Sequence, residues 1–332
     1  EMQMQRIVSR ACRHRAYAPG RGSSLVMAAA GTAGTSAATK SPQVSARVLA
    51  TDEPCIVKTK QLMAAHPGAL SLAQGIVHWQ PPPSALQAAA AAIASNPSVS
   101  GYGPADGLPA LREALRAKVA ARNGLEHYDI MVTAGANQAF TNVVLALCDA
   151  SDRVVLFTPY YFNHLMAIQM SGGGDNVVYG KCDSHTLHPD LDWLEAQLSG
   201  PAPPRMVVLV NPCNPTGVLL TPAEVARASQ LCAKAGAWLV LDNTYEDFAY
   251  DDGAAHACAA GPHVINLFSF SKAYGMMGWR VGYIAYPTYG SSSGLGAQLL
   301  KVQDTIPICP TQLSQVVALE ALQSGGQYVA ER

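Results

Sequence analysis

The stretch Met206-Val-Val-Leu-Val-Asn-Pro-Cys-Asn-Pro-Thr-Gly217 sets five consecutive apolar residues directly before a loop with two prolines and a glycine. A run that is apolar on both faces predicts a strand covered by helices on both sides of a sheet. Proline restricts φ and glycine permits a left-handed turn, so residues 211–217 predict a rigid, irregular connection. Such a loop can fix the amide of Asn214 at the end of the strand.

Six further short runs of β-branched and apolar residues surround this one, and patterns of helical period separate them. The seven runs are 130–133, 153–157, 176–179, 206–210, 238–242, 264–268 and 281–285. Helical patterns fall at 108–122, 137–148 and 221–236, the last with a Thr-Pro-Ala-Glu capping box at its start and a glycine at its end. We therefore predict an α/β fold with a seven-stranded, mainly parallel sheet and helices on both faces. Residues 289–296 predict a flexible loop.

The composition excludes several classes of protein. The 332 residues are 49% apolar and 14% charged, with a formal net charge of -1. This apolar share is sufficient for a full core, and the near-neutral charge predicts no binding to nucleic acid. No apolar run reaches the ~18 residues that a membrane-spanning helix needs, so we predict no membrane partner. The eight cysteines form no Cys-x-x-Cys pair, which favours reduced thiols.

Charge is unevenly distributed along the chain. Residues 1–50 hold seven basic residues and one acidic residue, and they are rich in Ala, Ser and Gly without a sustained helical or strand period. This pattern is typical of an organelle transit peptide. We predict a disordered leader or transit peptide over 1–50 and delivery to a plastid or mitochondrion; a cytoplasmic protein with an ordinary disordered arm is the alternative.

Chemically capable side chains follow the predicted strands, at the edge where open α/β sheets bind ligands. Residues 133–137 (Thr-Ala-Gly-Ala-Asn) join a strand to a helix whose N-terminal N–H groups can bind phosphate. Asp242 ends a buried strand, where an acid needs a cation or helix-cap hydrogen bonds, and Tyr245 follows three residues later. Lys272 lies among apolar residues, glycines and hydroxyls, where burial lowers the pKa of a lysine, and Arg280 can bind an anion.

This combination of groups fits pyridoxal 5'-phosphate (PLP). A lysine amine forms a Schiff base with the PLP aldehyde, a carboxylate keeps the ring nitrogen protonated, and amide and phenol groups hydrogen-bond the ring oxygen O3′. Arginine, hydroxyl and backbone N–H groups neutralise the phosphate. The residues therefore predict a PLP enzyme whose cofactor ring withdraws electrons from the substrate Cα.

The motifs Asn211-Pro-x-Asn-Pro-Thr-Gly217, Asp242-x-x-Tyr245 and Ser269-x-Ser-Lys272, with Arg280 after them, resemble the class I/II aminotransferases of PLP fold type I. The resemblance covers about 55–325 in matching order. It implies that Lys272 is the Schiff-base lysine and proton shuttle and that Asp242 is the partner of the pyridinium nitrogen; Tyr245 completes the catalytic set. It implies that PLP is bound by Tyr102, Ala136, Asn137, Tyr161, Asn214, Asp242, Tyr245, Ser269, Lys272 and Arg280.

The resemblance also implies individual roles within this set. Asn214 and Tyr245 would bind O3′, and Tyr161 would stack on the ring. The phosphate would be bound by Ala136, Asn137, Ser269 and Arg280. Tyr102, in Gly101-Tyr-Gly-Pro, is similar to the tyrosine that reaches the phosphate of the neighbouring subunit, which implies a homodimer with shared active sites. The implied substrate-binding residues are Gly75, Trp79 and Asn214.

The reaction that the resemblance implies is transamination between an amino acid and a 2-oxo acid by a ping-pong mechanism. Residues 71–82, 159–163 and 301–309 are similar to plant and algal aromatic aminotransferases, which implies aromatic amino acids, methionine and indole-3-pyruvate as substrates. Two alternatives stay open: a PLP lyase or synthase on the same fold, and a truncated, non-catalytic PLP-binding remnant.

The domain organisation follows from the same resemblance. Residues 51–95 correspond to an N-terminal arm and small-domain segment, 96–310 to the PLP-binding large domain, and 311–332 to the start of the C-terminal small domain. In the family that small domain supplies an arginine for the substrate α-carboxylate. Because the sequence ends at Arg332, we expect a truncated small domain without this arginine.

No metal site is predicted. His185-Thr-Leu-His188 and His256-Ala-Cys258 are short pairs that lack the second half of a zinc motif. His78, next to Trp79, is either at the substrate entrance or an ordinary loop histidine.

Overall fold

The computed structural model describes residues 42–250 and 255–332, in which strands and helices alternate along most of the chain. The strands are β1 (Tyr128–Thr133), β2 (Val154–Thr158), β3 (Val177–Lys181), β4 (Met206–Val210), β5 (Trp238–Asp242), β6 (Val264–Ser269) and β7 (Gly282–Pro287). The α-helices are α1 (Ala46–Leu49), α2 (Cys55–Ala65), α3 (Pro83–Ser95), α4 (Pro109–Asn123), α5 (Ala136–Leu147), α6 (Phe162–Met170), α7 (Leu191–Leu198), α8 (Pro222–Ala235), α9 (Leu295–Thr305), α10 (Gln312–Ser324) and α11 (Gly326–Ala330). The 3-10 helices are η3 (Pro97–Ser100), η4 (Gly174–Asn176), η5 (Met277–Trp279) and η6 (Gly290–Ser292).

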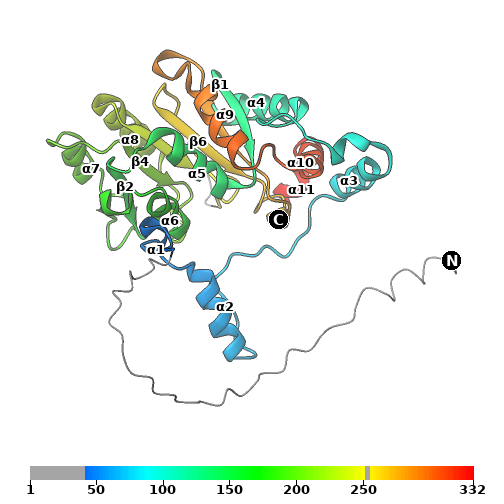
Figure 1. Ribbon diagram of the computed structural model, residues 1–332, viewed down its shortest axis with the longest axis horizontal. Helices are drawn as coiled ribbons and strands as arrows, with labels where there is room; N and C mark the ends of the chain where they lie inside the picture. Colours follow the sequence, from blue (N-terminus) through cyan, green and yellow to red (C-terminus); the bar gives the residue numbers. More distant parts are fainter. Residues whose placement is uncertain (1–41, 251–254) are drawn as a thin grey trace, which may run out of the picture. The chain divides into compact units, whose positions relative to one another are not determined.

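The seven strands form one sheet in the order β1-β7-β6-β5-β4-β2-β3 (Figure 1). Strands β2, β3, β4, β5 and β6 pair in parallel, whereas β7 is antiparallel to both of its neighbours, β1 and β6. Gly282, the first residue of β7, pairs with the last residues of β1 and β6, which are Thr133 and Ser269. The prediction of a seven-stranded, mainly parallel sheet is confirmed, and each predicted strand lies within two residues of its observed bounds.

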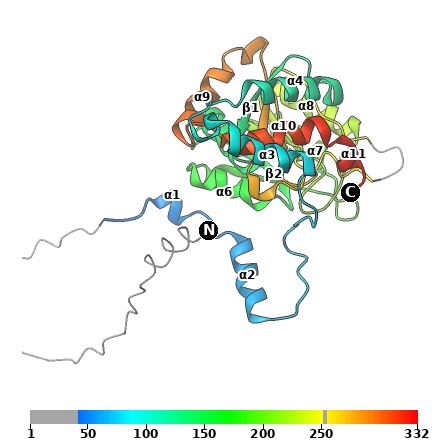
Figure 2. The same ribbon diagram turned by 90° about the vertical axis from the view of Figure 1, so that its right-hand side faces the viewer.

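Helices cover both faces of the sheet. Buried residues of α5, α6 and α9, such as Phe140, pack on one face. On the opposite face, residues of α3, α4 and α10 pack over β1, β6 and β7, and residues of α7 and α8 pack over β2, β4 and β5. Helices α3 and α10 lie side by side, as Figures 1 and 2 show. Two-sided coverage explains why the strands are apolar on both faces.

Local sequence signals explain where the helices on the second face begin and end. In α4 the side chains of Leu111, Leu115 and Val119 recur every four residues and are fully buried, which stabilises the fold by ~1.5–3 kcal/mol for each such side chain. Helix α8 begins with a capping box between Thr221 and Glu224. Its C-cap is Gly236 in the left-handed conformation, so both predicted ends of this helix are confirmed.

Three helices before the sheet, α1, α2 and α3, are not among the predicted helical patterns. Residues 1–41 of the predicted leader lie outside the described residues, whereas 42–50 include α1, which contacts α6. Helix α2 buries none of its residues, and Leu70 and Leu72 are 94% and 100% exposed. The predicted boundaries at residues 50, 95 and 310 stay predictions.

The stretch 289–296, predicted as a flexible loop, is partly helical. Residues 290–292 form η6, and α9 begins at Leu295. Ser292 is buried, and its hydroxyl donates to the carbonyl of Tyr289. The serine- and glycine-rich composition therefore reflects a tight helical connection rather than a long loop.

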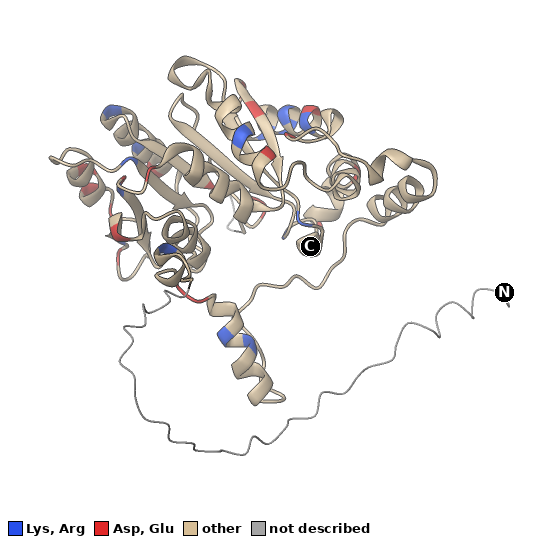
Figure 3. Cartoon of the chain, in the orientation of Figure 1, with Lys and Arg blue, Asp and Glu red and all other residues tan. Residues whose placement is uncertain are grey.

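Charged residues of both signs are scattered over the chain, with basic residues gathered on α4 (Figure 3). Arg112 of α4 pairs with Asp106 and Asp129, and Arg116 also pairs with Asp129. In the described part of the chain no helix is both long and apolar enough to cross a bilayer. The seven cysteines within the described residues are free thiols.

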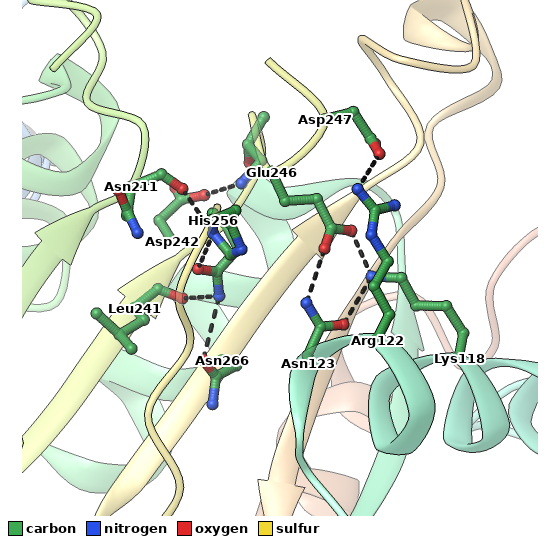
Figure 4. Close-up of polar contacts among 12 residues, drawn as sticks. Lys118, Arg122, Asn123, Asn211, Leu241, Asp242, Glu246, Asp247, His256 and Asn266 are labelled. Atoms are coloured by element: carbon green, nitrogen blue, oxygen red, sulfur yellow. Dashed lines mark hydrogen bonds and ion pairs between the residues drawn. The ribbon is translucent and has the colours of Figure 1, made fainter. Parts of the chain in front are cut away.

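An ionic cluster around the buried Glu246 fastens α4 to the turn that follows β5 (Figure 4). Glu246, in this turn, pairs with Lys118 and accepts a hydrogen bond from Asn123 Nδ2 at 3.0 Å. Arg122 pairs with Asp247 at 2.6 Å. Burial alone raises the pKa of Glu246, but the charges of Lys118 and Arg122 outweigh burial, so the pKa lies below the ordinary 4.5.

Replacing Lys118 with methionine should destabilise the fold by about 3–5 kcal/mol, because it leaves the Glu246 carboxylate buried without its cation. The double variant Lys118→Met/Glu246→Leu should recover most of this loss.

The stability of the native protein should also depend on pH through Glu246. The folded-state pKa of Glu246 is depressed, so its contribution to the free energy of unfolding is present above the unfolded pKa of 4.5 and is lost as the pH falls through the folded value. Urea denaturation at neutral pH and at about pH 4 measures both effects. An equal loss of stability in the single and double variants would show that Lys118 does not stabilise the fold by pairing with the buried Glu246.

Candidate active site

The ends of six strands meet at one edge of the sheet, and the predicted site residues come from these ends. Because β2, β4, β5 and β6 are parallel, their C-terminal ends share this edge, and β1 ends there too. Antiparallel β7 begins at the same edge, which brings in Arg280, two residues before it. Five loops of widely separated sequence therefore converge, as expected for a ligand site of an open α/β sheet.

Asp242, the last residue of β5, is the buried acid of this edge. The residue is 4% exposed. One carboxylate oxygen lies 3.0 Å from His164 Nε2, and the other accepts the Thr244 backbone N–H at 3.0 Å. Burial alone raises the pKa of Asp242, but the hydrogen bond and charge of His164 and the bonds from Thr244 outweigh it and hold the pKa below its ordinary value. Asp242 is therefore a carboxylate at neutral pH.

His164 is a site residue that the sequence reasoning missed. It lies in the first turn of α6, three residues after Tyr161, and it is 2% exposed. Asp242 can only accept, so Nε2 carries the proton, and Nδ1 has no partner among the described residues. The Tyr-x-x-His spacing, which sets both side chains on one side of a helical turn, is the signal that could have found it.

Lys272, in the loop after β6, has a partly buried amine. Its Nζ donates to the carbonyl oxygen of Gly75, which belongs to the segment before α3. Burial, and then the positive charge of Arg280, lower the pKa of Lys272 below the ordinary 10.5. Lowering the pKa raises the fraction of neutral amine, which is the nucleophilic form.

A place suited to an anion lies where the N-terminus of α5 meets Arg280. The N-cap of α5 is Gly135, and no side chain caps the helix, so its first N–H groups are free of a side-chain partner. Arg280 donates to the carbonyls of Met277 at 3.0 Å and Ala134 at 3.2 Å and has no acidic partner among the described residues. A guanidinium beside the positive end of a helix favours a phosphate group.

Two glycines make this close approach possible. Gly135 has φ +85, and a Cβ on it would lie against Nη2 of Arg280. A Cβ on Gly282, at the start of β7, would lie 2.6 Å from the backbone nitrogen of Ala136. Arg280 and the start of α5 together form what we call the phosphate cradle. This cradle depends on the absence of a side chain at both glycines.

Two phenols and two amides line the same edge. Asn214 Nδ2 donates to the Tyr245 hydroxyl at 3.4 Å, and the Tyr161 hydroxyl donates to Asn137 Oδ1 at 3.3 Å. Burial and the charge of Asp242 raise the pKa of Tyr245 to about 12, so its hydroxyl keeps its proton. The hydroxyl accepts from Asn214 and can still donate to a ligand oxygen.

The remaining predicted residues fall into two groups. Gly75 contacts Lys272, and Trp79 Nε1 donates to the carbonyl of Ala273, so the segment 75–80 lies against the lysine loop. Ser269 Oγ accepts the Ser271 backbone N–H within that loop. Tyr102 lies apart, because it is 84% exposed and none of its described contacts involves the other predicted site residues.

Comparison with known proteins gives a consistent result. A family model described as aminotransferase class I and II matches residues 67–331. The aromatic aminotransferase ISS1 of Arabidopsis thaliana is 50% identical over 290 residues, which cover 87% of this chain and 72% of that protein. An aspartate aminotransferase of Pyrococcus abyssi is 29% identical over 229 residues, which cover 67% of this chain and 57% of that protein.

Solved structures of aminotransferases have folds similar to that of this chain. An aspartate aminotransferase double mutant of Thermus thermophilus has a TM-score of 0.78 at 26% identity and covers 88% of this chain and 76% of its own. An aromatic aminotransferase of Pyrococcus horikoshii has a TM-score of 0.72 at 28% identity and covers 82% of this chain and 73% of its own. The chain belongs to the class I and II aminotransferases. This family consists of PLP-dependent enzymes of the transaminase type, and its fold is the one that the sequence predicts.

The donor set at the strand ends fits the cofactor of this family. The uncapped start of α5 and Arg280 suit a phosphate, the buried Asp242 carboxylate suits a protonated ring nitrogen, and the Lys272 amine suits an aldehyde. The described residues hold no group of three or more His, Cys, Asp or Glu side chains arranged around a metal ion. PLP is the cofactor of the class I and II aminotransferases, and the donor set at the strand ends suits it.

Replacing Gly135 with alanine should weaken PLP binding about 10- to 100-fold, because the new Cβ displaces the Arg280 guanidinium from the phosphate cradle. The matched control is Gly124→Ala at the end of α4, where φ is also positive but nothing lies within 4 Å of the added Cβ. Titration of the apo-protein with PLP, followed by absorbance, gives both dissociation constants. Equal affinities for PLP in the two variants would refute the role of Arg280 and the start of α5 in binding the phosphate.

Proposed function

We propose that this protein transfers the amino group of an aromatic amino acid or methionine to a 2-oxo acid, with Lys272 as the group that binds PLP covalently. The observation that carries the proposal is the convergence of Asp242, Lys272 and Arg280 on one sheet edge. The name of the Arabidopsis relative supports the aromatic substrate class. The comparisons do not favour the lyase or synthase alternative.

Each of the proposed cofactor contacts has a physical reason in this chain. Arg280, the start of α5 with Ala136 and Asn137, and the Ser269 hydroxyl would hold the phosphate. Asp242 would hold the proton on the ring nitrogen, because its pKa is low and a carboxylate can only accept. Asn214 and Tyr245 would donate to O3′, and Tyr161 would lie on the ring face.

When bound, PLP supplies an aldehyde carbon for the amine and a protonated ring that withdraws electrons from the substrate Cα. The amine of Lys272 would take the proton from the substrate Cα and deliver it to the cofactor carbon that carried the aldehyde, because burial and the charge of Arg280 lower its pKa and so raise its share of neutral amine, the form that acts as a base. Gly75, whose carbonyl accepts from the Lys272 amine, would orient that amine. Trp79, held by its bond to Ala273, would flank the substrate side chain.

Replacing Lys272 with alanine should abolish both the visible absorbance of the PLP-bound protein and amino transfer, because the covalent attachment and the proton shuttle are lost together. The control is Lys234→Ala on the exposed side of α8, which should leave both unchanged. Absorbance spectra and the amino acid formed from indole-3-pyruvate, with methionine as donor, are the measurements.

Amino transfer near the native rate in the Lys272 variant would overturn the assignment. Release of product without stoichiometric transfer to the added oxo acid would favour a lyase or synthase instead.

A homodimer with shared active sites is part of the proposal. Tyr102 is exposed, and its place on the loop before α4 leaves its ring free to enter a second subunit. The segment from Gly101 to Gly103 is held by Gln312, whose Nε2 donates to the carbonyl of Gly101 at 2.6 Å, so the loop is fixed while the phenol projects. A rigid loop with an exposed aromatic tip suits a contact across a two-fold axis.

Mixing the variants Tyr102→Ala and Lys272→Ala should restore activity to about a quarter of the native value, because half of the dimers are mixed and each of these holds one native site. Activity after joint refolding, compared with each variant refolded alone, is the measurement. A mixture no more active than its components would show that Tyr102 does not serve the neighbouring site.

The proposed location is a plastid or mitochondrion. The seven basic residues and single acidic residue within 1–50 support it, since transit peptides are rich in Arg and Ser and poor in acids.

A further inference from the structure

His256, which the proposed reaction does not use, lies between the two loops that carry Asn214 and Tyr245. Its ring nitrogen Nε2 is 3.2 Å from the carbonyl oxygen of Asn211 and 3.0 Å from Asn243 Oδ1. Asn211 begins the loop after β4, and Asn243 begins the turn after β5. Figure 4 shows the ring of His256 at this junction, beside Asn211 and Asp242.

The hydrogen-bond partners fix the state of the His256 ring. The carbonyl of Asn211 can only accept, and Asn243 presents its oxygen because its amide nitrogen donates to Leu241 O and Asn266 Oδ1, both at 3.2 Å. Nε2 therefore carries a proton that the two acceptors share. Burial lowers the pKa of His256, so the ring is neutral at neutral pH and donates through Nε2 alone.

The chain that follows His256 is tied by its backbone to the loop after β4 and to β6. We call residues 256–259 the strap. Asn211 Nδ2 donates to the carbonyl of Ala257 at 3.0 Å, and Asn266 Nδ2, from β6, donates to the carbonyl of Ala259 at 3.0 Å. The strap thus joins the loop after β4 to β6 through its backbone, and the His256 side chain adds a link to the turn after β5.

The link matters for the site because the two loops meet again at the proposed cofactor contacts. Asn214, three residues after Asn211, donates to the hydroxyl of Tyr245, two residues after Asn243, at 3.4 Å. A hydrogen bond of this length is near the limit of useful geometry, so a small shift of either loop breaks it. Asn243 is fully used by its contacts, which makes it a fixed reference point for the turn.

We propose that His256 is a positioning residue, which holds Asn214 and Tyr245 at the separation at which both can donate to one oxygen of the cofactor ring. The inference rests on the proposed function, because it assumes that these two residues bind O3′. His256 acts through them and has no described contact with Lys272 or Asp242.

A metal-binding role for the His256-Ala-Cys258 pair does not compete with this assignment. Burial, and then the nearby charge of Glu246, raise the pKa of Cys258 to about 12, so its sulfur stays a thiol, which is a poor metal ligand. The imidazole Nε2 is already engaged by two oxygens.

The test compares His256→Leu with His256→Gln. Leucine fills similar space without a donor, whereas the glutamine amide can reach both oxygens and donate. In the PLP-bound protein, His256→Leu should raise the midpoint pH of the visible-absorbance titration by about one unit, since weaker donation to O3′ stabilises its charge less. His256→Leu should also raise the PLP dissociation constant about 10-fold, and His256→Gln should return both values close to native.

A second comparison separates positioning from a general structural effect. In the background Tyr245→Phe, which itself should raise the midpoint, adding His256→Leu should shift the midpoint much less than in the native background, because the pair that His256 aligns is already broken. Equal shifts in both backgrounds would overturn the inference. So would a native midpoint in His256→Leu, or, if that variant gives no folded protein, in His256→Asn, whose shorter amide cannot span the two oxygens.

The outcomes also distinguish this inference from the function on which it rests. An unchanged midpoint in Tyr245→Phe overturns the proposed role of Tyr245 and the inference with it. A shifted midpoint in Tyr245→Phe together with a native midpoint in His256→Leu overturns the inference alone.

Discussion

The ionised carboxylate of Asp242, buried at the end of β5, is the constraint on which the rest of the site depends. A buried charge without partners costs several kcal/mol, so the surrounding structure has to supply hydrogen bonds to both oxygens. His164 from α6 supplies one, and the backbone of Thr244 supplies the other. The turn after β5 must therefore fold back on the strand end, and this same turn carries Tyr245.

Strand direction sets the electrostatic layout of the site. Parallel strands β4, β5 and β6 bring Asn214, Asp242 and Lys272 to one edge, and the reversal of β7 returns Arg280 to that edge rather than to the opposite one. Together with the N-terminus of α5, Arg280 makes a positive region that contrasts with the negative Asp242. A cofactor with a cationic ring nitrogen and an anionic phosphate matches both charges.

Support for the turn after β5 comes from two sides. Glu246 ties it to α4 through Lys118 and Asn123, and Asn243 ties it to β6 and to the strap. These supporting residues are polar and buried, so each is satisfied by a partner far away in sequence. These contacts fix the turn that carries the Tyr245 phenol on two sides.

The sequence by itself determined the seven strands, the capped helix α8, and the loop motifs that carry Asn214, Asp242, Tyr245, Lys272 and Arg280. Those signals are local: apolar periodicity, capping and turn chemistry act within a few residues. The sequence did not reveal α1 and α2, which bury almost nothing and so show no clear apolar pattern. It also did not reveal that residues 290–292 form a short helix. Only the tertiary structure decided that β7 is antiparallel, that His164 meets Asp242, that Lys118 meets Glu246, and that His256 joins two loops. Each of these contacts links residues from different elements, and the choice among such partners depends on how the helices and strands pack, which no short window of sequence contains.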